Sequence, residues 1–321
     1  MSRHVVVRSP ARLDFGGGWT DVPPFCDEEG GFVCNVAIQR YATVRVGERQ
    51  TSFGGENPEH SERPEAECIL LRAVARRFNA PALDIHLSSD FPLGAGLGGS
   101  SAAGVAAIAA LAAWQGRVYE LDQLAETSRA IETGELGIAG GRQDHYAAAY
   151  GGALALKFGT RVEVRRLRVD GATRGELARR GILIYTGQSR ISGDTISAVL
   201  DAYRRADPTV VRALRRMREL AQQMPEALER GNLDWLGSLV AEQWAAQRTL
   251  HPGIATPRID AIIDRAVRAG AVGAKALGAS GGGCVLVIAM SNRVPEVREA
   301  IAPLGELLEY EVDTGGVARC G

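Results

Sequence analysis

Pro92-Leu-Gly-Ala-Gly-Leu-Gly-Gly-Ser-Ser-Ala102 is the stretch of this 321-residue chain that most restricts its fold. It follows an alternating segment at 83–87, typical of a strand, and continues into an alanine-rich segment, apolar on nearly every face, that ends at Trp114. The pattern predicts a strand, a glycine-rich loop and a buried helix. Closely spaced glycines turn backbone N–H groups toward one concavity, and the helix start adds its positive end. The loop is therefore suited to bind phosphate.

Two well-known phosphate loops fit this stretch poorly. Three of its glycines match G-x-G-x-x-G, but dinucleotide-binding folds also need an acidic residue closing the next strand, about 20 positions on. Glu120 and Asp122 stand at that distance and begin a helical pattern instead. No lysine follows the glycines, which excludes G-x-x-x-x-G-K-[ST]. Ser100 can cap the helix or reach a phosphate-bound Mg²⁺, whereas for Ser101 we favour the cap.

Composition narrows the functional class. Hydrophobic residues make up 45% and charged residues 23%, with a net charge of −1, which is typical of a globular protein and excludes a disordered or collagen-like chain. No global charge attracts nucleic acid or an anionic membrane. No apolar run reaches the ~20 residues of a spanning helix, and the N-terminus lacks the apolar core of a signal peptide. We expect a soluble, cytoplasmic protein that binds neither nucleic acid nor membrane.

Cysteine and histidine patterns give no sign of a zinc or disulfide site. The five cysteines are odd in number, widely spaced and form no C-x-x-C. The five histidines are scattered and form no H-E-x-x-H.

Helix and strand patterns alternate along the whole chain and predict an α+β protein. Expected strands lie at 4–8, 32–37, 42–46, 83–87, 153–158, 162–169, 182–185 and 284–290. Expected helices lie at 69–78, 100–114, 121–137, 259–269 and over most of 194–248. The polar stretch 50–65 is predicted to be an exposed loop. The length favours two domains, 1–165 and 166–321, with a boundary in the region 155–180.

Two further motifs accompany the glycine-rich loop. Ser9-Pro-Ala-Arg-Leu-Asp-Phe-Gly-Gly-Gly-Trp-Thr-Asp21 lies near the N-terminus, and Lys275-Ala-Leu-Gly-Ala-Ser-Gly-Gly-Gly-Cys284 near the C-terminus. Together, in this order and spacing, the three resemble the motifs of the GHMP kinases. The resemblance implies a ribosomal-protein-S5-like N-terminal domain that binds ATP and a ferredoxin-like C-terminal domain, with the active site between them.

Within that family the sugar kinases resemble this chain best. The segment from Gly18 to Asp21, followed by Pro23-Pro24, is similar to both L-fucokinases and D-glycero-D-manno-heptose 7-phosphate kinases. Trp19 is more typical of fucokinases. The segment 141–152 is more similar to heptose kinases, which tend to carry a basic residue before Gln-Asp where fucokinases carry Trp. We favour a heptose kinase, with L-fucokinase or another hexose 1-kinase as the alternative.

The resemblance assigns the catalytic groups to Asp144 and Arg12. Asp144 would face the anomeric hydroxyl of the sugar and accept its proton, while Arg12 would keep Asp144 ionised and face the moving phosphoryl group. A purely structural salt bridge is the alternative. His145, next to Asp144, can equally touch substrate or serve packing.

The expected cofactors are ATP and Mg²⁺. Glu132 lies twelve positions before Asp144, the spacing of the metal-binding glutamate in galactokinase-type relatives. Ser100 and Glu132 would supply protein oxygens to Mg²⁺, which ATP phosphates and water would complete. A solvated carboxylate on a helix face is the alternative for Glu132, and Glu135 competes for the metal role. By resemblance, ATP phosphates would contact Pro92, Gly94, Ala95, Gly96, Leu97, Gly98, Gly99, Ser100 and Ser101.

Asp21 is the expected sugar binder, because a fixed carboxylate can accept hydrogen bonds from two adjacent hydroxyls. Its alternative is a turn-capping role before Pro23. The sequence departs from the family at Ser280, where glycine is usual, so the backbone angle there is in question. Gly99 replaces the first serine of the usual pair. The expected substrate-binding residues are Gly18, Trp19, Thr20, Asp21, Arg142, Gly281 and Gly282.

The functional expectation is an ATP-dependent kinase for the anomeric hydroxyl of a sugar or sugar phosphate, with a homodimer allowed. A substrate carrying a 7-phosphate would need an extra cationic pocket, for which Arg142 and Arg190 are the candidates. A non-catalytic sensor of sugar or ATP on the same fold is the alternative of a different class. Retention of Arg12, Ser100, Glu132 and Asp144 argues against it, because a sensor could lose any of them.

Overall fold

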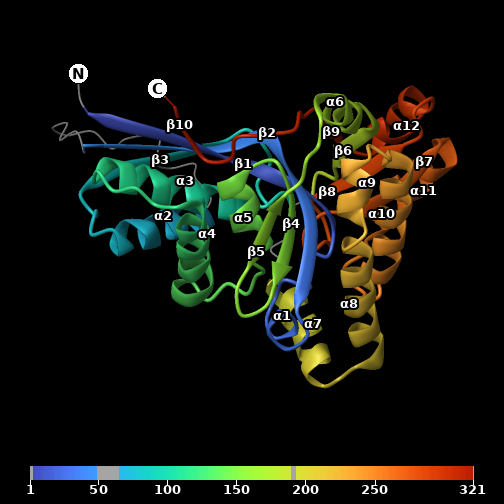
Figure 1. Ribbon diagram of the computed structural model, residues 1–321, viewed down its shortest axis with the longest axis horizontal. Helices are drawn as coiled ribbons and strands as arrows, with labels where there is room; N and C mark the ends of the chain where they lie inside the picture. Colours follow the sequence, from blue (N-terminus) through green and yellow to red (C-terminus); the bar gives the residue numbers. More distant parts are fainter. Residues whose placement is uncertain (1–2, 49–64, 189–192, 321) are drawn as a thin grey trace.

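The computed structural model describes residues 3–48, 65–188 and 193–320, and its strands form two sheets (Figure 1). The larger has the order β10-β1-β2-β4-β5, with β3 also paired to β2. Its strands are β1 (His4–Gly16), β2 (Gly31–Glu48), β3 (Leu83–Ser89), β4 (Ala153–Phe158), β5 (Glu163–Arg166) and β10 (Ala318–Cys320). The smaller, of order β7-β8-β6-β9, contains β6 (Gly181–Tyr185), β7 (Ala271–Ala276), β8 (Cys284–Ala289) and β9 (Glu306–Leu308). The predicted α+β class is confirmed.

One long strand, β2, organises the larger sheet. The sequence predicts two strands in this region, whereas β2 runs through both without a break. Its register with β1 shifts between Pro10 and Ala11, which pair with Tyr41 and Ile38. The extra β2 residues bulge there, opposite a proline that has no N–H for a ladder bond. β4 pairs with the first part of β2 and β3 with the last part.

The helices of the N-terminal half pack on the larger sheet. They are α1 (Phe25–Glu28), α2 (Glu65–Arg77), α3 (Gly99–Trp114), α4 (Leu121–Ala130), the π-helical turn η2 (Ile131–Glu135) and α5 (Gln143–Tyr150). α3 contacts both β1 and β2 as well as α2, α4 and α5. Its many alanines let neighbours approach from every side, as the apolar sequence predicts. α3 is therefore a central buried helix whose start is held rigidly.

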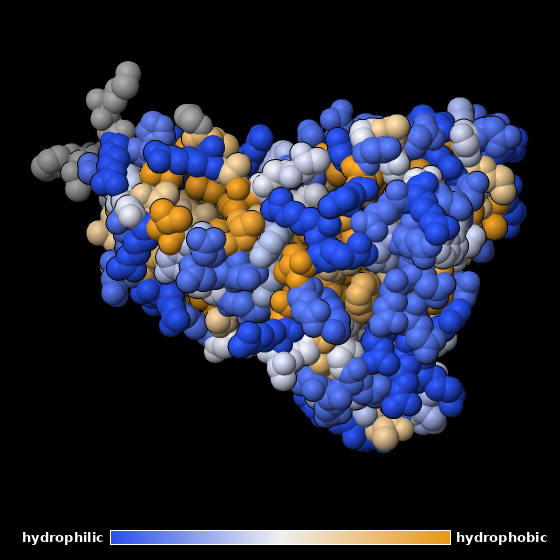
Figure 2. Space-filling model, viewed as in Figure 1, coloured by the Kyte–Doolittle hydropathy of each residue, from blue (hydrophilic) through white to orange (hydrophobic). Residues whose placement is uncertain are grey.

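The C-terminal half surrounds the smaller sheet with helices. They are α6 (Gly171–Arg180), α7 (Gly193–Arg204), α8 (Pro208–Ala221), α9 (Met224–Glu229), α10 (Leu233–Gln247), α11 (Pro257–Ala269), α12 (Val294–Ile301) and the 3-10 turn η3 (Ala302–Leu304). α10 packs on β7 and β8. Hydrophilic residues cover the lower right of the face in Figure 2, where Figure 1 places α7 and α8.

Both sheets contribute residues to the larger of two apolar clusters, and the second cluster packs on the smaller sheet. The main cluster of buried residues includes Leu13 of β1 and Leu154 of β4 together with Leu286 of β8. The chain end also returns to the larger sheet, where β10 pairs with β1 close to the N-terminus (Figure 1). Because the halves are packed against each other, side chains from both contribute to the cavity described below.

Some sequence expectations differ from the structure or lie outside it. Helices α5, α6 and α12 have no counterpart among the predicted elements, because segments of 8 to 10 residues are too short to show a clear helical period. Most of the predicted loop 50–65 lies outside the described residues.

Candidate active site

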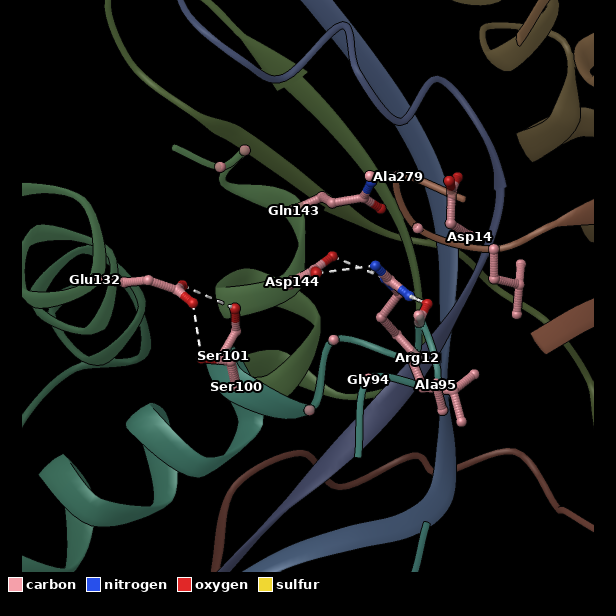
Figure 3. A pocket seen from close by; sticks show the side chains of 18 of the residues that line it. Arg12, Asp14, Gly94, Ala95, Ser100, Ser101, Glu132, Gln143, Asp144 and Ala279 are labelled. Atoms are coloured by element: carbon pink, nitrogen blue, oxygen red, sulfur yellow. Dashed lines mark hydrogen bonds and ion pairs between the residues drawn. The ribbon is translucent and has the colours of Figure 1, made fainter. Parts of the chain in front are cut away.

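A cavity of about 580 Å³ lies where distant segments of the chain meet. β1 and the turn after it form one wall, residues 87–101 form another, and residues 277–282 close a third side. Residues of η2 and of α5 complete the wall. Every residue of 92–101 lines the cavity, so the three sequence motifs face one space (Figure 3).

The glycine-rich loop uses left-handed backbone that glycine adopts without strain. Gly94, Gly96 and Gly98 have φ angles of 67°, 73° and 74°. A Cβ on Gly96 would lie 2.7 Å from the backbone oxygen of Leu277, so the loop packs directly on the chain that follows β7. α3 begins at Gly99, and no side chain caps its first N–H groups. Those groups remain available to a phosphate at the helix N-terminus.

The two serines at the start of α3 face Glu132 (Figure 3). Ser100 Oγ donates to Glu132 Oε1 at 2.7 Å, and Ser101 Oγ lies 3.4 Å from Oε2. Neither serine caps the helix, which corrects the expectation for Ser101. η2 carries Glu132, whereas Glu135 is exposed and does not line the cavity.

Glu132 is held as a carboxylate. Burial would raise its pKa, but hydrogen bonds from His145 and from Ser100 and Ser101 keep the pKa below its usual range. His145 Nε2 lies 3.0 Å from Glu132 Oε2. Across the described residues no cluster of three or more His, Cys, Asp or Glu side chains forms a metal site. Two protein oxygens beside a phosphate loop nevertheless suit Mg²⁺, which keeps waters and takes phosphate oxygens as further ligands.

Arg12 and Asp144 form a two-point ion pair. Arg12 Nε lies 2.7 Å from Asp144 Oδ1, and Nη2 lies 2.9 Å from Oδ2. Nη1 of Arg12 donates to the backbone oxygen of Gly96, which ties the pair to the glycine-rich loop. Both residues line the cavity, but the Arg12 side chain is only 3% exposed whereas that of Asp144 is 26% exposed.

The charge of Arg12 is secured by its surroundings. Burial would lower its pKa, but Asp144, Asp14 and Asp21 together raise the pKa above its usual value. The guanidinium therefore stays positive beside Asp144.

Asp21 lies in the cavity wall and is almost fully buried. Its Oδ2 accepts a hydrogen bond from the backbone N–H of Gln143 at 2.9 Å, which joins the turn after β1 to the start of α5. A Cβ on Gly141 would lie 1.9 Å from that oxygen, so the approach needs glycine. Burial raises the pKa of Asp21 to about 6, the Gln143 bond opposes this, and Asp144 and Asp14 add to it.

The other expected sugar-binding residues separate into two groups. Gly18, Trp19 and Gly282 line the cavity. Thr20 does not, because its hydroxyl is used within the turn, where it bonds to the backbone oxygens of Gly17 and Phe32. Trp19 has a positive φ of 82°, is 6% exposed, and its Nε1 has no hydrogen-bond partner.

Two expected residues are not part of the cavity wall, and a third is not among the described residues. Gly281 and Arg142 do not line the cavity, although both adjoin residues that do. Arg142 stands immediately before α5, where it is half-buried. Arg190 lies outside the described residues.

Asp14, Lys275 and Gln143 belong to the site region and were missed by the sequence reasoning. Lys275 Nζ lies 2.9 Å from Asp14 Oδ2 and 2.8 Å from the Asp14 backbone oxygen, and both side chains are buried. Burial lowers the pKa of Lys275 although Asp14 raises it. The available signal was a lysine inside the apolar run of β7, because such a charge needs a buried partner. Asp14 and Gln143 line the cavity; Asp14 Oδ1 has no partner.

Ser280 keeps the backbone of the glycine it replaces. Its φ is 71°, in the left-handed region. Its Oγ accepts a hydrogen bond from Gln247 Nε2 at 3.1 Å, and the same nitrogen donates to the backbone oxygen of Gly278 at 3.1 Å. The side chain of α10 thus fixes the turn against the cavity.

Within the residues that the structure describes, no helix combines the length and apolar character that crossing a bilayer requires.

Known proteins resemble this chain over most of its length. It is 28% identical over 298 residues to D-glycero-alpha-D-manno-heptose 7-phosphate kinase of Campylobacter jejuni, covering 86% of each chain. It is 26% identical to the bifunctional fucokinase/GDP-fucose pyrophosphorylase of Arabidopsis thaliana, covering 99% of this chain and 33% of that one. The structure of a D-glycero-D-manno-heptose 1-phosphate kinase of Bacteroides thetaiotaomicron superposes with a TM-score of 0.77, 23% identity and 99% coverage of both chains.

Two family models match in the expected order. The model of the GHMP kinases N terminal domain matches residues 66–152, which include the glycine-rich loop, Glu132 and Asp144. The model of the GHMP kinases C terminal domain matches residues 224–305, which include the 278–282 turn. With the two-sheet fold and the phosphate loop in place, the chain belongs to the GHMP kinase family and is a kinase.

Proposed function

We propose that this kinase transfers the γ-phosphoryl group of ATP to the anomeric hydroxyl of a sugar, with Asp144 as the base. The observation that carries the proposal is the Arg12–Asp144 pair, which presents a partly exposed carboxylate to the cavity beside the glycine-rich loop. In the reaction the hydroxyl oxygen forms a bond to the γ-phosphorus while the bond from that phosphorus to the ADP oxygen breaks. The hydroxyl proton passes to Asp144.

Each group of residues in the cavity wall has a different role in this proposal. The loop 92–101 and the start of α3 cradle the phosphates. Ser100 and Glu132 would hold Mg²⁺, which neutralises phosphate charge when it is bound with ATP. Arg12 orients Asp144, since two of its nitrogens bond to that carboxylate and the third is held by Gly96. Asp21 would accept hydrogen bonds from sugar hydroxyls.

We favour D-glycero-D-manno-heptose 7-phosphate as the acceptor. The support is the relative from Campylobacter jejuni, which is covered over 86% of its length and bears that name. Arg142 would have to turn toward the cavity to meet the 7-phosphate, or Arg190 would have to supply the charge.

L-Fucose is the second candidate, and one observation favours it. Among the described residues of the cavity wall, Arg12 is the only cation, and it is already paired with Asp144. A neutral sugar needs no second cation. Trp19 adds an apolar ring to the wall, and the Arabidopsis thaliana relative named a fucokinase is matched over 99% of this chain.

The test is ATP consumption with Mg²⁺ against heptose 7-phosphate, L-fucose, galactose and mannose, with the wild type and Asp144→Asn. Loss of the base should lower kcat by about 10²-fold or more, while ATP affinity is nearly kept. Asp201→Asn is the matched control, because that carboxylate pairs with Arg204 on the surface. Equal turnover by the wild type and Asp144→Asn would overturn the role of Asp144. Turnover on L-fucose alone would keep the mechanism and replace the acceptor.

A further inference from the structure

α5 places two adjacent side chains in two different polar pairs. Asp144 pairs with Arg12, and the next residue, His145, lies 3.0 Å from Glu132. Successive residues on a helix are turned by about 100°, so neighbours can serve opposite sides of one site. His145 is 1% exposed and does not line the cavity, so it reaches the cavity through Glu132 and through a longer contact, 3.4 Å, between its Nε2 and the Ser101 hydroxyl.

The hydrogen bond between His145 and Glu132 has only one possible direction. An ionised carboxylate accepts only, so the Nε2–H of His145 donates to Glu132 Oε2. Its Nδ1 lies 2.9 Å from the hydroxyl of Ser128, which is itself buried on α4. In the neutral ring Nδ1 accepts from that hydroxyl. The imidazole is therefore held at both nitrogens and cannot rotate without losing both bonds.

We propose that His145 is a positioning residue that sets the orientation of Glu132 toward the nucleotide-bound divalent cation. His145 restrains Oε2, and the other oxygen, Oε1, accepts a hydrogen bond from the Ser100 hydroxyl at the start of α3. Because Glu132 stands on the short η2 turn, its side chain needs such a second anchor to hold one orientation. This inference rests on the proposed metal role of Glu132.

A close contact between α3 and α4 keeps the Ser128 hydroxyl beside His145. A Cβ on Gly104 of α3 would lie 2.4 Å from Ser128 Oγ, so a larger residue there would push the hydroxyl away from His145. A Cβ on Gly134 of η2 would meet no atom within 4 Å, which makes Gly134 a neutral position near Glu132. The chain of contacts thus joins α3, α4, η2 and α5.

Two amide substitutions test the two hydrogen bonds of His145 separately. His145→Gln can place its amide nitrogen near the Nε2 position and keep the bond to Glu132. His145→Asn reaches only the Nδ1 position and keeps the contact to Ser128. The readout is Mn²⁺ binding in the presence of ATP, followed by electron paramagnetic resonance. We expect His145→Asn to weaken Mn²⁺ binding by about 10–100-fold and His145→Gln by much less.

Supporting readouts exclude a general loss of folding. ATP affinity in EDTA should be the same for both variants, and the Mg²⁺ concentration for half-maximal activity should rise for His145→Asn only. Gly104→Ala should weaken Mn²⁺ binding in the same direction, with Gly134→Ala as the matched control. Equal Mn²⁺ affinity in His145→Asn and His145→Gln would overturn the inference.

The variant Glu132→Gln distinguishes a failure of this inference from a failure of the proposed metal role of Glu132. If Glu132→Gln weakens Mn²⁺ binding and His145→Asn does not, the metal role stands and the positioning role of His145 is overturned. If Glu132→Gln leaves Mn²⁺ binding unchanged, Glu132 is not a metal ligand. Both its proposed metal role and the positioning role of His145 are then overturned.

Discussion

Arg12 of β1 and Asp144 of α5 meet through two hydrogen bonds of 2.7 and 2.9 Å, although 132 positions separate them in the chain. The arginine is buried and the carboxylate is partly exposed to the cavity. A third bond from Arg12 to Gly96 couples this pair to the phosphate loop. The carboxylate proposed as the base, its cation and the glycine-rich loop are therefore directly connected.

Arg12→Lys should lower kcat at least about tenfold, because an ammonium group cannot form the planar two-point contact that orients Asp144. ATP affinity should change little. Steady-state kinetics with the preferred sugar gives the measurement, and Arg204→Lys, on the surface, is the control. An unchanged kcat would show that the second hydrogen bond to Asp144 is dispensable.

Asp21 should impose an acidic limit on sugar binding. Its pKa is raised to about 6 by burial, so the carboxylate that we propose to accept sugar hydroxyls becomes protonated as the pH falls through about 6. We expect kcat/KM for the sugar to fall there, with the KM for ATP unaffected. In Asp21→Asn this limb of the pH profile should be absent, and its persistence would assign it to another group.

The same shift predicts how stability depends on pH. The folded protein binds the Asp21 proton more tightly than the unfolded chain, whose pKa is near 3.8. Relative to Asp21→Asn, the free energy of unfolding should therefore fall as the pH rises from about 4 to about 6, by up to about 3 kcal/mol. Urea unfolding at several pH values measures it, and an opposite slope would contradict the prediction.

Lys275→Met should lower the free energy of unfolding by about 3–5 kcal/mol, because it leaves the Asp14 carboxylate buried without its cation. Adding Asp14→Asn should recover part of that loss, since the remaining group is then neutral. Chemical denaturation of the wild type, both single variants and the double variant forms the cycle. Additive losses would mean that the two residues do not interact energetically.

Gly141→Ala should weaken sugar binding strongly, because the new Cβ would stand 1.9 Å from Asp21 Oδ2 and displace that carboxylate. Gly140→Ala is the matched control, since a Cβ there meets no atom within 4 Å. The KM for sugar distinguishes the two. Similar KM values for both variants would mean that Asp21 does not need its present position.

Ser280→Ala should lower the free energy of unfolding by about 1 kcal/mol, because it keeps a Cβ in the left-handed region and loses the bond from Gln247. Ser280→Gly should cost less, since glycine relieves the backbone strain while losing the same bond. Thermal unfolding of the two variants compares them. A less stable glycine variant would show that the serine backbone is not strained.

The sequence by itself determined those elements that depend on neighbouring residues along the chain. The alanine-rich run predicts a helix buried on every side, and α3 is that helix, because a segment apolar all round has no face for water. The glycines of 94–98 predict tight turns, and the structure has them in left-handed backbone, since only glycine adopts such angles without cost. The spacing of Glu132 and Asp144 could be recognised only through the resemblance to galactokinase-type relatives, because no local pattern connects the two residues.

Only the tertiary structure decided which polar groups meet. The pairing of Asp14 with Lys275 joins residues 261 positions apart, and no periodicity reveals such a partner. The same holds for the contact of His145 with Glu132 and Ser128 and for the position of Arg142 outside the cavity wall. A side chain's partner depends on how whole elements pack, because hydrogen bonds are satisfied across the fold rather than along the chain.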